Sequence, residues 1–184
     1  MKSPGRSFSL SLMPIALLLA ACSSAMRSAV SRATAIMYNT TGAPVGTAQI
    51  WQDKNGVVYV DIASLALPAG THGIHFHAVG KCEGSTSPAF STAGGHYNPM
   101  GREHGLQNPA GPHAGDNPNI VIPASGVGNV NFSTNRVSLT PGPTSVFDAD
   151  GTSLVIHASA DDQVTNPAGN SGARIACGVV TAIP

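Results

Sequence analysis

Residues 73–77 read Gly73-Ile74-His75-Phe76-His77, in which apolar and imidazole side chains alternate. Successive side chains of a β-strand point to opposite faces, so a strand here puts Ile74 and Phe76 on one face and both histidines on the other. The apolar face is suited to a core. The opposite face then presents two imidazoles side by side, an arrangement that can chelate a metal ion.

A second strand with the same chemistry lies near the C-terminus. Residues 154–157 read Leu-Val-Ile-His, so Leu154 and Ile156 suit the core and His157 lies on the outer face. Two strands and a loop can therefore supply a chelating trio. Any one of these histidines taken alone is more often a surface or hydrogen-bonded residue, whereas the set as a whole favours a metal site.

The rest of the chain continues this strand chemistry. Short runs rich in β-branched and aromatic residues recur, with Gly, Pro, Asn or Asp in most of the gaps, and no stretch has the period of a long amphipathic helix. The sequence predicts an all-β fold, an eight-stranded antiparallel β-sandwich or flattened barrel with Greek-key connections. The predicted strands are residues 34–38, 45–51, 57–63, 73–78, 119–122, 127–132, 153–157 and 173–181.

Two segments are too long to be simple turns. Residues 79–118 are rich in Gly, Pro, Asn and Ser, and residues 158–172 have little apolar content. Loops of this length inside a compact domain are usually functional. The first loop also carries three imidazoles and a carboxylate of the kinds that close a tetrahedral zinc site. These residues are His96, His104, His113 and Asp116.

Five motifs, taken in order, resemble the copper/zinc superoxide dismutase family. The resemblance runs from about residue 34 to the C-terminus and so covers essentially the whole domain. It implies the family's β-sandwich fold, its copper and zinc cofactors and superoxide as substrate. The motifs are Gly73-Ile74-His75-Phe76-His77, Gly95-His96-Tyr97-Asn98-Pro99, His104-Gly105, His113-Ala114-Gly115-Asp116 and Gly172-Ala173-Arg174-Ile175-Ala176-Cys177-Gly178.

The resemblance also implies a role for each site residue. Superoxide would be converted to dioxygen and hydrogen peroxide by alternate reduction and oxidation of the copper, with zinc holding a bridging histidine. His96 would be that bridge and carry a proton, Arg174 would guide the anion, and Asp161 would orient one histidine of each metal. The implied copper ligands are His75, His77, His96 and His157, and the implied zinc ligands are His96, His104, His113 and Asp116.

The sequence departs from the family pattern at two places. An insertion around residues 84–91 stretches the spacing between His77 and His96. The loop between Asp161 and Arg174 is short, and residues 163–172 contain no charged side chain. Metal ligation is unaffected by these changes, but weaker electrostatic steering of the substrate is expected.

The N-terminus has the layout of a secretory signal. Lys2 and Arg6 precede an apolar run over residues 10–21, which is too short to span a bilayer as a helix. Residues 19–22 read Leu-Ala-Ala-Cys and look like a bacterial lipobox, so we expect a lipid on Cys22; ordinary cleavage at an Ala-x-Ala-like site is the alternative. With Ser23 next, a Gram-negative host would place the protein in the periplasm, anchored to the outer membrane.

The remaining cysteines agree with export, since Cys82 and Cys177 form an even pair in a chain bound for an oxidising compartment. A disulfide is expected, with two buried free thiols as the alternative. Without Lys2 and Arg6, seven basic side chains face nine acidic ones, which disfavours nucleic-acid binding. The predicted division is a signal peptide over 1–21, a lipidated tether over 22–33 and one enzymatic domain over 34–184, as a monomer or homodimer.

Two other functions are compatible with the ligand types. A copper carrier could keep the histidines without turnover, but it needs neither an anion guide such as Arg174 nor a ring-orienting Asp161. A structural lipoprotein could use the zinc site alone, but His77 and His157 would then be idle. The enzyme is the function that uses all of these residues.

Overall fold

The computed structural model describes residues 31–184. The predicted signal peptide and Cys22 lie outside the described residues. Within the described part, the only helix is a short 3₁₀ turn, η1 (Ser91–Ala93), and no helix there is long and apolar enough to cross a membrane. The predicted all-β class is confirmed.

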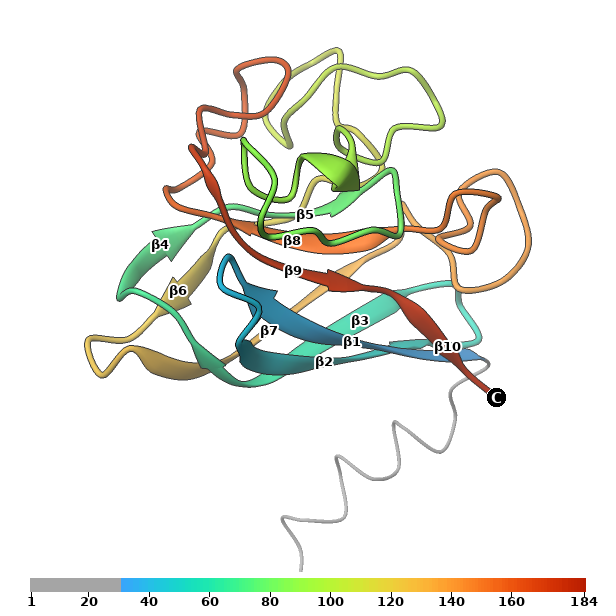
Figure 1. Cartoon of the computed structure of the whole chain (residues 1–184). Coiled ribbons are helices and arrows are strands. Elements are labelled where there is room, and N and C mark those ends of the chain that lie inside the picture. The colour runs from blue at the N-terminus through green and yellow to red at the C-terminus, as the bar shows by residue number, and fades with distance from the viewer. Residues whose placement is uncertain (1–30) are drawn as a thin grey trace, which may run out of the picture.

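Ten strands form the domain, two more than the eight expected (Figure 1). The additional ones, β4 and β10, have three residues each, which is too short for an alternating pattern to be recognised in the sequence. The strands are β1 (Ser31–Asn39), β2 (Pro44–Gln52), β3 (Val58–Ala66), β4 (Gly70–His72), β5 (Ile74–His77), β6 (Ile120–Ile122), β7 (Val127–Thr134), β8 (Ser153–His157), β9 (Arg174–Val179) and β10 (Thr181–Ile183).

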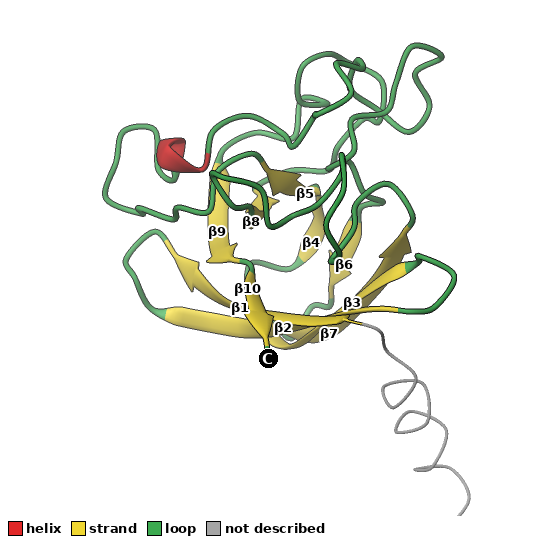
Figure 2. Ribbon diagram, turned by 90° about the vertical axis from the view of Figure 1, so that its right-hand side faces the viewer, coloured by secondary structure: helices red, strands yellow, loops and turns green. Residues whose placement is uncertain are grey.

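The main sheet has the order β5-β8-β9-β1-β2-β3-β7, with β10 also paired to β1. All of these pairings are antiparallel, and β4 with β6 makes a separate antiparallel pair. The sheet curls, so that β5 and β8 lie across from β1, β2 and β3 (Figures 1 and 2). Strand β1 already begins at Ser31, because Arg32 and Ala33 pair with Trp51 and Ile50 of β2.

The core lies inside the curl and follows the alternation read from the sequence. Ile74 and Phe76 of β5 and Leu154 and Ile156 of β8 are fully buried. Burying each of these side chains contributes about 1.5–3 kcal/mol. Register pairs Ile74 with Ile156 and Phe76 with Leu154, so the two strands present one continuous apolar face.

The opposite face of β5 and β8 is buried as well, which differs from the outer face expected. Both strands are buried at every position, because the long loops before β6 and after β8 lie over them (Figure 1). A side chain on that face is therefore enclosed between sheet and loops. His75, His77 and His157 lie on this enclosed face.

A disulfide ties the first long loop to the sheet. Cys82 and Cys177 are bonded, with their Cα atoms 5.6 Å apart and a sequence separation of 95. Closing a loop of that length stabilises the fold by about 4–5 kcal/mol on the chain-entropy model. Phe90, Ala93 and Val155 pack around Cys177 as a small second core, so the start of the loop is firmly fixed. The predicted bridge is confirmed.

Candidate metal centre

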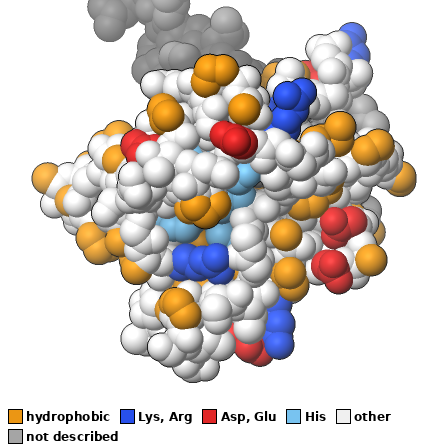
Figure 3. Space-filling model, turned by 90° about the horizontal axis from the view of Figure 1, so that it is seen from above, with side chains coloured by type: hydrophobic (Ala, Val, Ile, Leu, Met, Phe, Trp, Pro, Cys, Tyr) orange, Lys and Arg blue, Asp and Glu red, His pale blue; other side chains and the backbone are white. Residues whose placement is uncertain are grey.

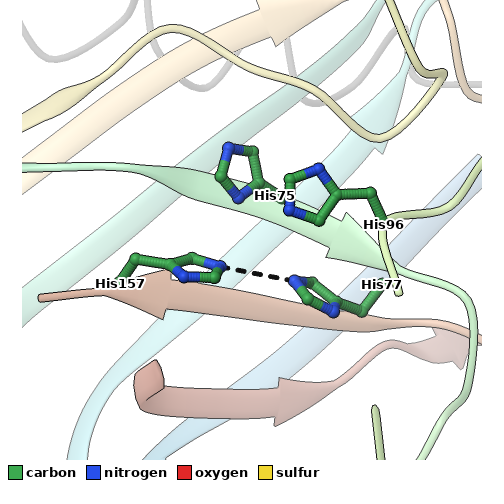
Figure 4. Close-up of side chains that lie close together, drawn as sticks. All are labelled: His75, His77, His96 and His157. Atoms are coloured by element: carbon green, nitrogen blue, oxygen red, sulfur yellow. Dashed lines mark hydrogen bonds between the residues drawn. The ribbon is translucent and has the colours of Figure 1, made fainter. Parts of the chain in front are cut away.

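Four imidazoles meet on the covered face of β5 and β8 (Figure 4). His75 and His77 come from β5, His157 from β8, and His96 from the first long loop, which pairs with His77 through an isolated bridge. Each offers a ring nitrogen within 4.8 Å of those of the others. Nε2 of His77 and Nε2 of His157 are 3.4 Å apart. The structure thus brings together the four residues expected for copper.

A second group shares His96 with the first. It consists of His96, His104, His113 and Asp116, whose ligand atoms also lie within 4.8 Å of one another. Nδ1 of His96 and of His104 lie 2.9 and 3.0 Å from Oδ1 of Asp116, and Nδ1 of His113 lies 3.5 Å from the same oxygen. Three ring nitrogens therefore converge on one buried carboxylate, which is the donor set of a closed zinc site.

The outward nitrogens of the first group are held by acceptors around the site. His75 donates through Nε2 to Asp161, His77 through Nδ1 to the carbonyl of Gly94, and His157 through Nδ1 to the carbonyl of Gly172. Each bond fixes the tautomer, so the other nitrogen of each ring carries a lone pair that points inward.

Within residues 31–184, two of the four inward nitrogens in the first group have no partner, while Nε2 of His77 and Nε2 of His157 face each other. Among the described residues, Nδ1 of His75 and Nε2 of His96 are buried with no hydrogen-bond partner, as is Nδ1 of His113 in the second group. Buried polar atoms are almost always paired, so an orphaned cluster of this kind needs an explanation. A soft-to-borderline metal ion held by imidazole nitrogens supplies it, and the residues fit copper on one side of His96 and zinc on the other.

Asp161 joins the two groups from outside. Its Oδ2 accepts from Nε2 of His75 at 2.6 Å, and its Oδ1 accepts from Nε2 of His104 at 3.0 Å. The carboxylate is buried, and the backbone N–H of Gln163 also donates to it. One side chain thereby orients a histidine of each group, as the resemblance implies.

Burial sets the protonation of the first group. It lowers the pKa of His157 to about 3 and that of His96 to about 4, and the pKa of His77 is also well below its usual value. Burial is the main cause in each case, followed by the charge of a neighbouring histidine for His157 and His77. The imidazoles of His77, His96 and His157 are therefore neutral near pH 7, which is the form that binds a metal.

In the second group, hydrogen bonds outweigh burial in setting the pKa values. Burial would lower the pKa of His104, but hydrogen bonds to Asp116 and Asp161 outweigh it and raise the pKa to about 9. Burial would likewise raise the pKa of Asp116, but hydrogen bonds from His104, His96 and Gly105 and the nearby ring of His113 hold that pKa far below its usual range. The carboxylate is ionised at any working pH and can offer a charged oxygen to a cation.

Arg174 stands at the entrance to the first group. Its Nη1 donates to the carbonyl of Phe90 and its Nη2 to that of Gly94, each over 2.6 Å. A hollow lined by Arg174, Gly94 and Gly172 opens beside it. Figure 3 looks down on the loops and shows histidine side chains at the bottom of an opening with a basic side chain at its rim. The guanidinium is fixed where an incoming anion would meet it.

The sequence did not reveal several contacts that hold the site. Nη2 of Arg136, in the loop between β7 and β8, donates to the backbone carbonyl of Asp116 over 2.5 Å. Asn119 exchanges two hydrogen bonds with the backbone of Asp161. Gly169 has φ +62°, and a Cβ at this position would collide with the Asp161 carboxylate and the His104 ring. These residues belong to no recognisable motif, and only Gly169 carried a signal, as a glycine in a functional loop.

Comparisons with known proteins agree with this centre. A family model described as copper/zinc superoxide dismutase (SODC) matches residues 45–180. A Cu-Zn superoxide dismutase of Deinococcus radiodurans is 42% identical over 181 residues, which cover 94% of this chain and 94% of that protein. Cu-Zn superoxide dismutase 1 of Aquifex aeolicus is 44% identical over 145 residues, covering 78% of this chain and 84% of that protein.

The fold is similar to solved structures as well. The crystal structure of a double mutant of a SOD-like protein from Bacillus subtilis superposes with a TM-score of 0.73 at 40% sequence identity, covering 79% of this chain and 95% of that one. The predicted sandwich architecture is thus confirmed by an independent comparison.

Proposed function

Because this chain belongs to the copper/zinc superoxide dismutase family, we propose that the two histidine groups sharing His96 are its copper and zinc sites. The chain is an oxidoreductase that converts superoxide to dioxygen and hydrogen peroxide, with copper and zinc as its cofactors. The observation that carries the assignment of residues is the inward-facing set of bare imidazole nitrogens.

The first group would hold copper through His75, His77, His96 and His157, and copper, alternately reduced and reoxidised, supplies the electron transfer. Burial keeps His77, His96 and His157 neutral, and hydrogen bonds to Asp161, Gly94 and Gly172 fix the rings of His75, His77 and His157. Rigid rings that tolerate more than one coordination geometry suit a metal that changes oxidation state.

The second group would hold zinc through His96, His104, His113 and Asp116. Its contribution is positional, since Nδ1 of His96 lies against Asp116 while Nε2 faces the first group. A ring held at one nitrogen can take up or release a proton at the other without leaving its place. His96 is accordingly the residue we propose to carry a proton, at Nε2, during turnover.

Arg174 would bind and orient the superoxide anion. Its guanidinium is always charged, and two carbonyls fix it beside the entrance. Its fixed positive charge at the hollow beside Gly94 and Gly172 would attract an anion toward the copper group. Removing it should weaken anion capture while leaving metal binding intact.

We also propose that the protein works outside the cytoplasm, in the periplasm, anchored to the outer membrane by a lipid on Cys22. The signal-like residues 1–21 and the lipobox at residues 19–22 support export and anchoring. The Cys82–Cys177 disulfide fits an oxidising compartment. All proposed ligands come from one chain, so either a monomer or a homodimer would be active; the enzymatic domain, expected over 34–184, would begin at Ser31 with β1.

Dismutation by the purified full chain, loaded with copper and zinc, tests the proposed roles. His77→Ala should abolish turnover, Arg174→Ala should slow it about tenfold or more, and Lys54→Ala, an exposed cation, serves as the matched control. Tight copper binding without turnover in the unmodified protein would favour a copper carrier instead.

The anchor has its own test. Mass spectrometry of the exported protein should find a diacylated Cys22 at the N-terminus, and Cys22→Ser should release the protein from the membrane fraction. Cleavage without lipid would leave the enzyme assignment intact and overturn the anchor alone.

A further inference from the structure

A second hollow lies away from the metal centre, between the first long loop and the loop that joins β7 to β8. It has a volume of about 330 Å³. Its polar side chains are Arg102, Asn135, Arg136 and Thr144, and Pro112 and Ala114 add an apolar wall. None of these residues is a proposed metal ligand, although Arg136 also donates to the backbone carbonyl of Asp116. The hollow also shares no lining residue with the one beside Arg174.

The side chains that line this hollow carry a net positive charge. Two guanidinium groups line it and no carboxylate does. Among residues 31–184, every ion pair involves a histidine or Lys81, so neither Arg102 nor Arg136 is paired with an acid. The buried Asp116 carboxylate offsets part of the charge of Arg136, and the positive charge that remains in the lining favours an anion in the hollow.

The hydrogen-bond donors of the hollow are also unused. Within the described part of the chain, the side chains of Arg102, Asn135 and Thr144 make no hydrogen bond, although backbone groups of Arg102 and Thr144 do. Arg136 is only partly satisfied: Nη2 donates to the carbonyl of Asp116, and Nε is buried without a partner. Guanidinium, amide and hydroxyl groups together form a donor-rich surface that suits an acceptor-rich ligand.

We propose that this hollow binds a small oxyanion of the phosphate type, held between the guanidinium groups of Arg102 and Arg136. Planar guanidinium forks match the geometry of phosphate oxygens and can bind them in pairs. Asn135 and Thr144 would donate to the remaining oxygens. Arg136 would then donate from one side of its guanidinium to the backbone carbonyl of Asp116 and from the other side to the anion.

A titration with inorganic phosphate tests the site on the full chain loaded with zinc and reduced copper. Amide NMR signals of Asn135 and Thr144 should shift in a saturable way at constant ionic strength. Because phosphate can also meet Arg174, signals of Gly172 and Ala173 are followed separately. Arg174→Ala should remove the shifts at Gly172 and Ala173 and leave those at Asn135 and Thr144.

The matched variants concern the two arginines of the hollow. Arg102→Gln should weaken phosphate binding at Asn135 and Thr144 about tenfold, and it should not disturb the fold because the Arg102 side chain is exposed and contacts no partner there. Arg136→Lys keeps the charge but loses the fork, and a similar weakening is expected. Three results would overturn the proposal: equal shifts with sodium chloride, shifts confined to Gly172 and Ala173, or unchanged phosphate affinity in Arg102→Gln.

Discussion

His75 donates a hydrogen bond through Nε2 to Oδ2 of Asp161 over 2.6 Å, and both side chains are fully shielded from solvent. The same carboxylate accepts from His104, so it spans the two histidine groups. An aspartate that spans two metal sites should influence both metals at once, although it ligates neither.

Asp161→Asn tests this directly. The amide keeps one acceptor oxygen but turns an N–H₂ group toward the other imidazole, which can no longer donate to it. Affinity for copper and for zinc should each fall about 10- to 100-fold, as measured by competition with a chelator. Asp162→Asn is the control, because Asp162 is exposed and bonds only within its own loop. Loss of one metal alone would contradict the bridging role.

Gly169→Ala should reproduce much of that effect without touching a ligand. The added Cβ would meet the Asp161 carboxylate and the ring of His104, which forces both to move. The residue also has φ +62°, which costs an alanine about 1–2 kcal/mol. Zinc affinity and thermal stability should both fall.

Gly42→Ala separates the cost of the left-handed backbone from the effect of the steric contact. Gly42 has φ +82° but nothing lies within 4 Å of the added carbon. It should lose stability by the conformational cost alone and keep full metal affinity. Equal metal affinities in the two variants would show that contact with Asp161 is unimportant.

Arg136→Gln should weaken zinc binding. The variant loses a charge-assisted hydrogen bond to the backbone of Asp116, worth about 1.5–3 kcal/mol in similar cases. If about half of that free energy is lost from zinc binding, zinc affinity falls about tenfold. Chelator competition measures it, with Arg102→Gln as the control that should affect phosphate but not zinc.

The metal-free protein should be most stable near neutral pH. His96 and His157 have folded pKa values of about 4 and 3, against an ordinary value of 6.5. Between pH 6.5 and 4 the unfolded chain binds protons at these two positions that the folded chain does not. Stability should therefore fall with acidification by about 3 kcal/mol per pH unit.

Above neutral pH, stability should instead fall as the pH rises. His104 has a folded pKa of about 9, so its stabilising contribution is complete below pH 6.5 and is lost as the pH rises to 9. Urea unfolding of chelator-treated protein from pH 4.5 to 9.5 measures both limbs. A stability that keeps rising to pH 9 would contradict the arrangement of His104 between two carboxylates.

How far the sequence could predict this protein depends on the kind of contact. The alternation in residues 73–77 and 154–157 was enough to place the apolar face of β5 and β8 and to group His75, His77 and His157, because period-two patterns are local. The metal-site residues in the loops were predicted from their types and the family resemblance. Arg136 was not predicted, because its role depends on a backbone carbonyl that the fold brings close from a distant loop.

The burial of the histidine face was also missed, and for a physical reason. Period-two alternation distinguishes two faces of a strand but does not tell whether a loop covers the second. Here the loops do so, and they turn an ordinary amphipathic strand into one enclosed on both sides. That enclosure is what lowers the pKa values of His77, His96 and His157.

One carbonyl oxygen of the first loop has two donors. The oxygen of Gly94 accepts from Nδ1 of His77 at 3.0 Å and from Nη2 of Arg174 at 2.6 Å. The proposed anion guide and a proposed copper ligand therefore share one backbone acceptor. Redesign of this enzyme toward another anion therefore cannot relocate the guide independently: a shift of Gly94 that widens the entrance also retunes the electron-transfer site.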